Sequence, residues 1–99
     1  MIEYPIANPE IVFREEDGEA LLFDPKTGEI KLLNKTGSLI YKLCDGRHKR
    51  EDMVKEIIEN FEIEDEKRVR SDLDKFLKEL QDKGFIGKEI GKRNEKRDL

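Results

Sequence analysis

The chain has 99 residues, of which 35% are hydrophobic and 44% are charged, so it can build one domain around a small hydrophobic core. Its formal net charge of −4 argues against a general nucleic-acid binder, because such binders need a surplus of Lys and Arg to neutralise phosphates. No apolar run is long enough to span a bilayer and no signal-peptide pattern is present, so we expect a cytoplasmic protein without a membrane partner.

The first third of the chain alternates between strand and turn signals. Residues 1–9 contain two prolines and no helical period, which predicts an extended N-terminal arm. Two apolar runs follow, separated by Asp17-Gly18, a dipeptide typical of two-residue hairpins, and a proline-glycine turn at 24–28 leads into a third run. These signals predict an antiparallel β-meander, whose third strand lies at the sheet edge if the order is sequential, with strands near residues 10–15, 19–24 and 29–33.

Helical signals dominate the rest of the chain. Asn34 is a favoured N-cap and Asp45-Gly46 is a helix stop, while later apolar residues recur at helical spacing. Lys49 is a poor N-cap, so the start of the second helix is the least defined boundary. The expected fold class is α+β and winged helix-turn-helix-like: a three-stranded antiparallel β-meander, then three α-helices near residues 35–44, 50–60 and 65–83. The segment 91–99 has no apolar period and is expected to be a charged, disordered tail.

Catalytic and metal-binding patterns do not emerge from the sequence. Cys44 is the single cysteine and His48 the single histidine, which are too few to build a structural zinc site. Cys44 falls on the apolar face of the first predicted helix, where a buried thiol is the ordinary interpretation. We therefore expect a protein that is not an enzyme and that holds no metal and no cofactor.

The segment that joins the two halves, residues 33–46, has the pattern L-N-x-T-G-x-x-I-Y-x-L-x-D-G. Together with Asn8-Pro9, the turn at 24–28 and the closing Gly84-Phe85-Ile86, it resembles the signature of the PqqD-like family over roughly residues 5–90. On this resemblance we expect a PqqD-like peptide-binding domain at residues 10–90, preceded by the arm and followed by the tail.

The resemblance implies a peptide chaperone. It would bind the leader of a ribosomally synthesised precursor peptide by β-strand addition and present it to a modifying enzyme, commonly of the radical S-adenosylmethionine type. In that family the leader lies between the third strand and the third helix, which carries over to Ile30, Lys31, Leu32, Leu33, Val69, Asp72, Leu73 and Phe76. Two cations on the same helix flank as Asp72 complete the candidate peptide-binding set, Arg68 and Lys75.

Several of these residues also fit ordinary structural roles. Leu73 and Phe76 suit a plain hydrophobic core, and strand alternation lets only one of Lys31 and Leu32 face each side of the sheet. Whether the Lys31 amide points to the free edge or to the second strand stays open at this stage. The alternative function is a winged helix-turn-helix DNA-binding regulator, although the third helix mixes acidic with basic residues. A third possibility is a structural subunit that binds a protein partner only.

Overall fold

The computed structural model describes residues 3–87, so the predicted tail at 91–99 lies outside the described part of the chain. The elements follow the expected order, and each boundary of the meander and the helices lies within two residues of its predicted position. They are β1 (Ile6–Ala7), β2 (Val12–Glu16), β3 (Glu19–Phe23), β4 (Ile30–Leu33), α1 (Lys35–Lys42), α2 (Arg50–Phe61), α3 (Glu66–Asp82) and β5 (Ile86–Gly87).

The main sheet is antiparallel with the strand order β2-β3-β4, which confirms the predicted meander and the α+β class. Its first hairpin turns at Asp17 and Gly18, with φ of 56° and 85°, the two positive values that a two-residue type I′ turn needs. In the second turn the Asp24 carboxylate accepts from the Lys26 amide at 2.9 Å, and Gly28 has φ of 80°. The residues of the two turns therefore determine where the chain reverses direction between the strands of the main sheet.

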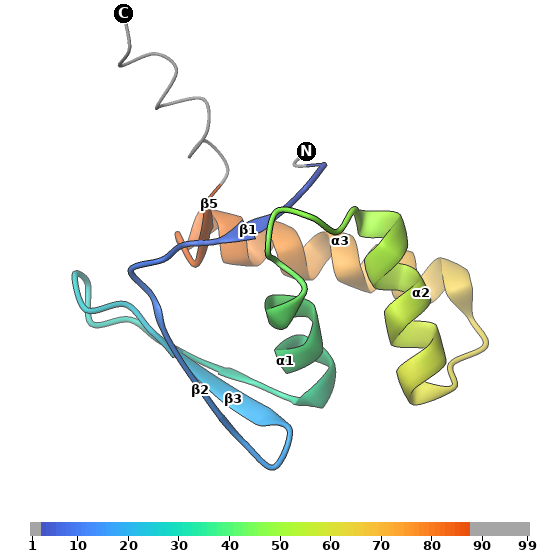
Figure 1. The fold of residues 1–99 in the computed structure, drawn as a ribbon, viewed down its shortest axis with the longest axis horizontal. Helices are drawn as coiled ribbons and strands as arrows, with labels where there is room; N and C mark the ends of the chain where they lie inside the picture. The colour runs from blue at the N-terminus through green and yellow to red at the C-terminus, as the bar shows by residue number, and fades with distance from the viewer. Residues whose placement is uncertain (1–2, 88–99) are drawn as a thin grey trace, which may run out of the picture.

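Helix α1 packs against this sheet, and α2 lies farther from the sheet, beyond α1 (Figure 1). Asn34 caps α1 as expected, because its Oδ1 accepts from the Gly37 amide at 2.8 Å. Asp65 caps α3 in the same way, accepting from the Arg68 amide at 3.1 Å. The start of α2 is capped differently, because the Asp52 carboxylate accepts from the Lys49 amide at 3.0 Å. An acidic side chain in the first turn thus binds a backbone amide at the helix start, where Lys49 is a poor N-cap.

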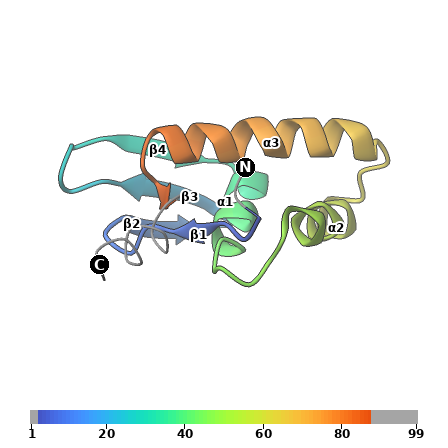
Figure 2. The ribbon, with the colours of Figure 1, turned by 90° about the horizontal axis from the view of Figure 1, so that it is seen from above.

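The core lies between the inner face of the sheet and the three helices. Its fully buried members come from every layer: Leu22, Met53, Leu73, Leu80, Phe85 and Ile86. Tyr41 joins the layers, since its hydroxyl donates to the Phe85 carbonyl at 3.0 Å and its ring stacks on Phe13. Figure 2 shows α3 along one side of the molecule, beside β4 at one end and near α2 at the other.

The first and last strands of the described residues meet in a second, two-stranded sheet, in which β1 pairs antiparallel with β5. The Ala7 amide also donates to the Cys44 carbonyl at 2.7 Å, and the Asn8 side chain donates to the Gly84 carbonyl at 3.0 Å. The N-terminal segment is thus tied to the end of α1 and to the segment after α3. Within residues 3–87, no helix combines the length and the apolar character that crossing a membrane requires.

Candidate functional site

The free edge of β4 is the first component of the candidate site. The strand order leaves β4 paired only with β3, on one side. The Asp24 amide donates to the Glu29 carbonyl at 2.9 Å, and hydrogen-bonded pairs alternate along an antiparallel ladder. The pairs Leu22–Lys31 and Ala20–Leu33 are therefore the hydrogen-bonded ones. The backbone groups of Lys31 thus point to β3, and those of Ile30 and Leu32 point to the free edge.

Side chains of β4 alternate in the same way. Lys31 and Leu33 face α3, whereas Ile30 and Leu32 face the opposite side of the sheet and are 58% and 75% exposed. The Lys31 ammonium lies 2.7 Å from Glu79 Oε2 and 5.9 Å from the centre of the Phe76 ring. The strand therefore carries a different pair of residues toward each face.

A groove of about 410 Å³ lies where the end of β4 meets the start of α1 and the first half of α3. Buried Leu33, Val69 and Leu73 form its floor and belong to the core as well, so their structural and site roles coincide. Half-buried Phe76 and exposed Asp72 also border it. Its complete lining is Leu32, Leu33, Asn34, Thr36, Gly37, Ile40, Ile57, Ile63, Val69, Asp72, Leu73 and Phe76.

Four of the candidate residues lie outside this lining. Ile30 is on the outer face. Lys31 lies nearer the start of the strand than the groove does, and its ammonium is bound to Glu79. Arg68 is exposed and has an ion pair of 3.7 Å with Asp72 one helical turn away, which is a weak surface contact. Lys75 is exposed on α3.

Two ion pairs connect β4 and its turn to the second half of α3. One is Lys31 with Glu79, and the other joins Lys83 Nζ to Glu29 Oε2 at 3.1 Å. They hold the C-terminal end of α3 against the strand, while the apolar lining gathers beside its N-terminal half. The gap between β4 and α3 is therefore bridged by charges at one end and open and apolar at the other.

Gly37 explains why the groove exists at this point. A Cβ atom there would lie 3.2 Å from Cζ of Phe76 and 3.4 Å from Asn34 Oδ1, closer than side chains ordinarily pack. Glycine therefore lets α1 approach α3 while Phe76 stays at the groove wall.

Sequence reasoning missed the part of the lining that comes from α1, α2 and the connection before α3. These residues are Thr36, Gly37, Ile40, Ile57 and Ile63. The T-G pair in the joining segment was the available signal, because a glycine inside a helix indicates close packing. The isoleucines follow the general apolar pattern and carry no separate signal.

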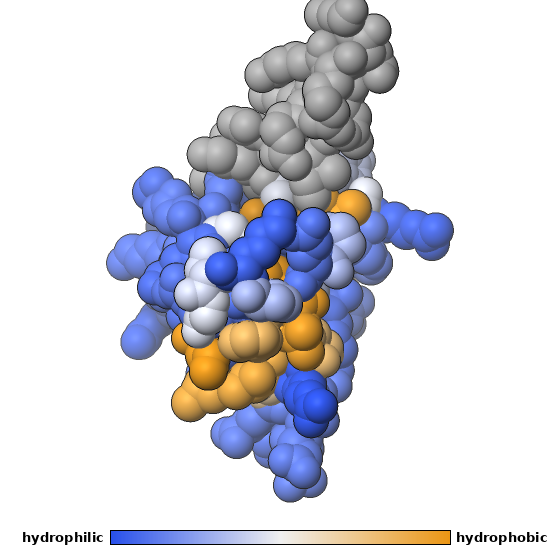
Figure 3. Space-filling model, turned by 90° about the vertical axis from the view of Figure 1, so that its left-hand side faces the viewer, coloured by the Kyte–Doolittle hydropathy of each residue, from blue (hydrophilic) through white to orange (hydrophobic). Residues whose placement is uncertain are grey.

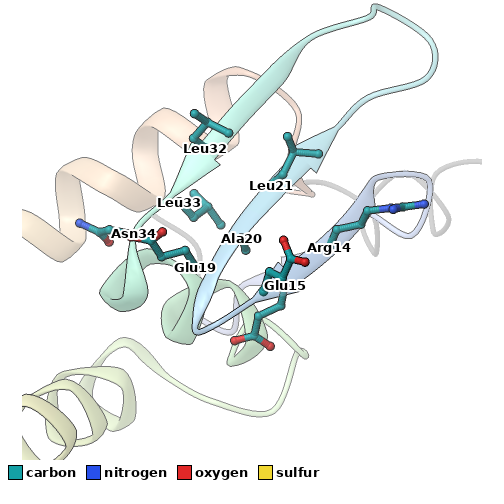
Figure 4. Close-up of a pocket in the computed structure, with 9 residues that line it drawn as sticks. Arg14, Glu15, Glu19, Ala20, Leu21, Leu32, Leu33 and Asn34 are labelled. Carbon is teal, nitrogen blue, oxygen red and sulfur yellow. The ribbon is translucent and has the colours of Figure 1, made fainter.

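A second hollow, of about 870 Å³, lies on the other side of the end of β4 (Figure 4). It shares residues 32–34 with the groove and adds the end of the first hairpin, including Glu16 and Glu19. Figure 4 shows Leu21 and Leu32 projecting from neighbouring strands, while Leu33 points the other way. The end of β4 is therefore accessible from both faces.

The residues that could carry chemistry lie apart from this groove. Cys44 is buried, and its burial raises the pKa of the thiol to about 12, which disfavours a reactive thiolate. His48 Nδ1 lies 3.0 Å from the Asp45 carboxylate in a surface turn. Within residues 3–87, no group of three or more His, Cys, Asp or Glu side chains could hold a metal ion.

Comparisons with known proteins agree with this architecture. The family described as Coenzyme PQQ synthesis protein D (PqqD) matches residues 19–86, from β3 to β5. A similar solved structure is described as TbiB1 in Complex with the TbiA(beta) Leader Peptide. It is 26% identical, with a TM-score of 0.75, and the match covers 84% of this chain and 95% of that one. No curated protein matches the chain.

Proposed function

The chain belongs to the PqqD family, and from that premise we propose that it is a peptide-recognition domain. It binds the leader of a ribosomally synthesised precursor peptide. The observation that carries this proposal is the open edge of β4 beside an apolar groove. The structural neighbour of the same fold is a complex with a leader peptide. The domain performs no chemistry itself.

We propose that the leader adds antiparallel to Ile30–Leu33 as a fourth strand. The backbone groups of Ile30 and Leu32 would then exchange hydrogen bonds with it, as in other cases of strand addition. Its inward side chains lie over Leu33 and Phe76, where they remove apolar surface from water. We expect micromolar affinity, about −8 kcal/mol at 1 μM, after the cost of ordering the peptide.

The direction of the added strand suggests where a modifying enzyme would act. An antiparallel leader has its N-terminal residues opposite Leu33 and its C-terminal residues opposite Ile30. The part of the precursor that follows the leader therefore leaves beside the turn at 24–29 and the end of α3. We propose that the enzyme partner, of the radical S-adenosylmethionine type common in this family, takes the precursor at that end.

No observation favours the alternative of DNA binding. Three cations of α3 already pair with carboxylates: Arg68 with Asp72, Arg70 with Glu51 and Glu66, and Lys78 with Asp82. These ion pairs engage cations of the helix that would have to enter a DNA groove.

The test uses the leader segment encoded by the short open reading frame nearest to this gene. The synthetic peptide is titrated into isotope-labelled protein, and we expect the largest chemical-shift changes at Ile30, Leu32, Val69 and Phe76. A scrambled peptide and a duplex DNA fragment serve as controls. Shift changes confined to α2, or salt-dependent retention of the DNA without peptide binding, would contradict the proposal.

A further inference from the structure

The outer face of the main sheet, opposite the helices, carries an apolar surface that shares only Leu32 with the groove. Ile30 and Leu32 are the most exposed large apolar residues of residues 3–87. Ile30 follows Phe23 and Val12 in one cross-strand row, and Leu32 follows Leu21 in the next. Figure 3 shows apolar side chains gathered on this side of the molecule, with hydrophilic residues around them.

An added strand must cover part of this surface. Ile30 and Leu32 direct their backbone groups to the free edge, so each forms a hydrogen-bonded pair with the residue opposite it. Directly opposite residues of such a pair project to the same face, with their Cα atoms about 5.5 Å apart. Two residues of the added strand, separated by one, therefore lie beside Ile30 and Leu32 and away from α3.

We infer that Ile30 and Leu32 determine leader specificity from the outer face, by selecting two apolar side chains at positions i and i+2 of the bound segment. This inference rests on the proposed function and narrows its substrate class. Residues between and beside these positions face the groove and contact Leu33 and Phe76. The bound segment is thus apolar on both faces, rather than alternating between apolar and polar residues.

The exposure and the position of Ile30 and Leu32 support the leader as the segment that covers this face. The exposure is greatest on β4, the edge strand that borders the groove, and it is lower, 40%, for Val12 on β2, the other edge strand of the sheet. The outward side chains of the added strand continue the two existing rows by one residue each. Cross-strand pairs of apolar side chains stabilise sheets, so each continued row adds to affinity.

The test compares the double variant Ile30→Thr/Leu32→Thr with Val12→Thr. Threonine is β-branched and is favoured in strands, so the backbone edge stays intact, and circular dichroism checks the fold. Val12 is a matched control, because it lies on the same face but two strands away from the added peptide. The probe is a phage-displayed library of random dodecapeptides, selected on wild type and on each variant.

We expect wild type and Val12→Thr to enrich peptides with apolar residues at both sets of alternate positions. The double variant should lose the apolar preference at the two positions opposite residues 30 and 32. It should keep the apolar preference at the positions that face the groove. A synthetic peptide selected on wild type should bind the double variant about 2- to 30-fold more weakly than it binds wild type. This is the range for the loss of two cross-strand apolar pairs.

Equal affinity for the double variant, or an unchanged apolar preference at both sets of positions, would overturn the inference while the proposed function stands. A proposed function that is itself wrong gives a different result: wild type enriches no peptide, or its peptides bind a folded Leu32→Pro variant with full affinity. Sedimentation velocity of the free protein adds one further outcome. A wild-type dimer that the double variant dissociates would mean that a second copy covers this face, which also overturns the inference.

Discussion

Replacing Leu32 with proline should abolish most peptide binding while the domain remains folded. The Leu32 amide points to the free edge, so proline removes a donor that the added strand needs and leaves a peptide carbonyl unpaired. The Leu32 side chain is 75% exposed, so its loss costs the folded state about 1 kcal/mol or less. A lost hydrogen bond with an unsatisfied partner amounts to about 1–3 kcal/mol, which is roughly a 5- to 150-fold weaker Kd.

Lys31→Pro is the matched control, because its amide points the other way. It donates within the Leu22–Lys31 pair, and Leu22 is fully buried. Proline at 31 would leave the Leu22 carbonyl unsatisfied at a cost of about 1–3 kcal/mol, a large part of the 5–15 kcal/mol typical of a domain. This variant should therefore lose stability in urea, whereas Leu32→Pro should lose affinity.

Fluorescence anisotropy with the leader peptide measures binding, and circular dichroism during urea unfolding measures stability. A folded Leu32→Pro protein that binds the leader as tightly as wild type would refute strand addition at this edge. If Lys31→Pro instead kept its stability and lost only affinity, the assigned hydrogen-bond register of β4 would be wrong.

The remaining predictions concern the scaffold. Asn34→Ala should lower the unfolding free energy by about 1 kcal/mol, because the Gly37 amide loses its cap, and Asn34→Asp should restore most of it in urea titrations. Cys44 should resist Ellman's reagent at pH 8 until the protein unfolds, since burial raises the thiol pKa to about 12; immediate stoichiometric reaction would contradict this. The Arg70 guanidinium lowers the pKa of Glu51 below 4.5, so the stability that this pair contributes is present above about pH 4.5 and is lost as the pH falls through the folded-state pKa. The difference in Tm between wild type and Glu51→Gln should accordingly shrink from pH 6 to pH 3. Elemental analysis of the purified protein should find no stoichiometric metal, and one tightly held zinc per chain would contradict the expectation.

The sequence was informative wherever structure depends on neighbouring residues. Asp17-Gly18 determines a hairpin through its own backbone preferences, and Asn34 caps the helix that begins at the next residue. These local signals were sufficient to place the meander, the helices and the open edge of β4. The resemblance then indicated β4 and α3, two of the elements that line the groove.

Features that depend on distant contacts were not predictable in this way. The pairing of Ile6 and Ala7 with Ile86 and Gly87 joins two-residue segments from opposite ends of the domain, which leave no periodic pattern. The direction of the Lys31 amide depends on the register with β3, and the pattern of residues in β4 alone allows either choice. The contact between α1 and Phe76 at Gly37 likewise exists only in the packed structure.

The inward-facing Lys31 has a consequence for the protein without its peptide. An open strand edge invites pairing with other copies and promotes aggregation, and natural sheets often guard such edges with a charged side chain that points inward. Lys31 occupies such a position, and Glu79 neutralises it within the fold. An indiscriminate strand that approached this edge would have to place a side chain beside that charge pair. The same residue therefore limits self-association of the empty domain while leaving the backbone of Ile30 and Leu32 available to a peptide of suitable sequence.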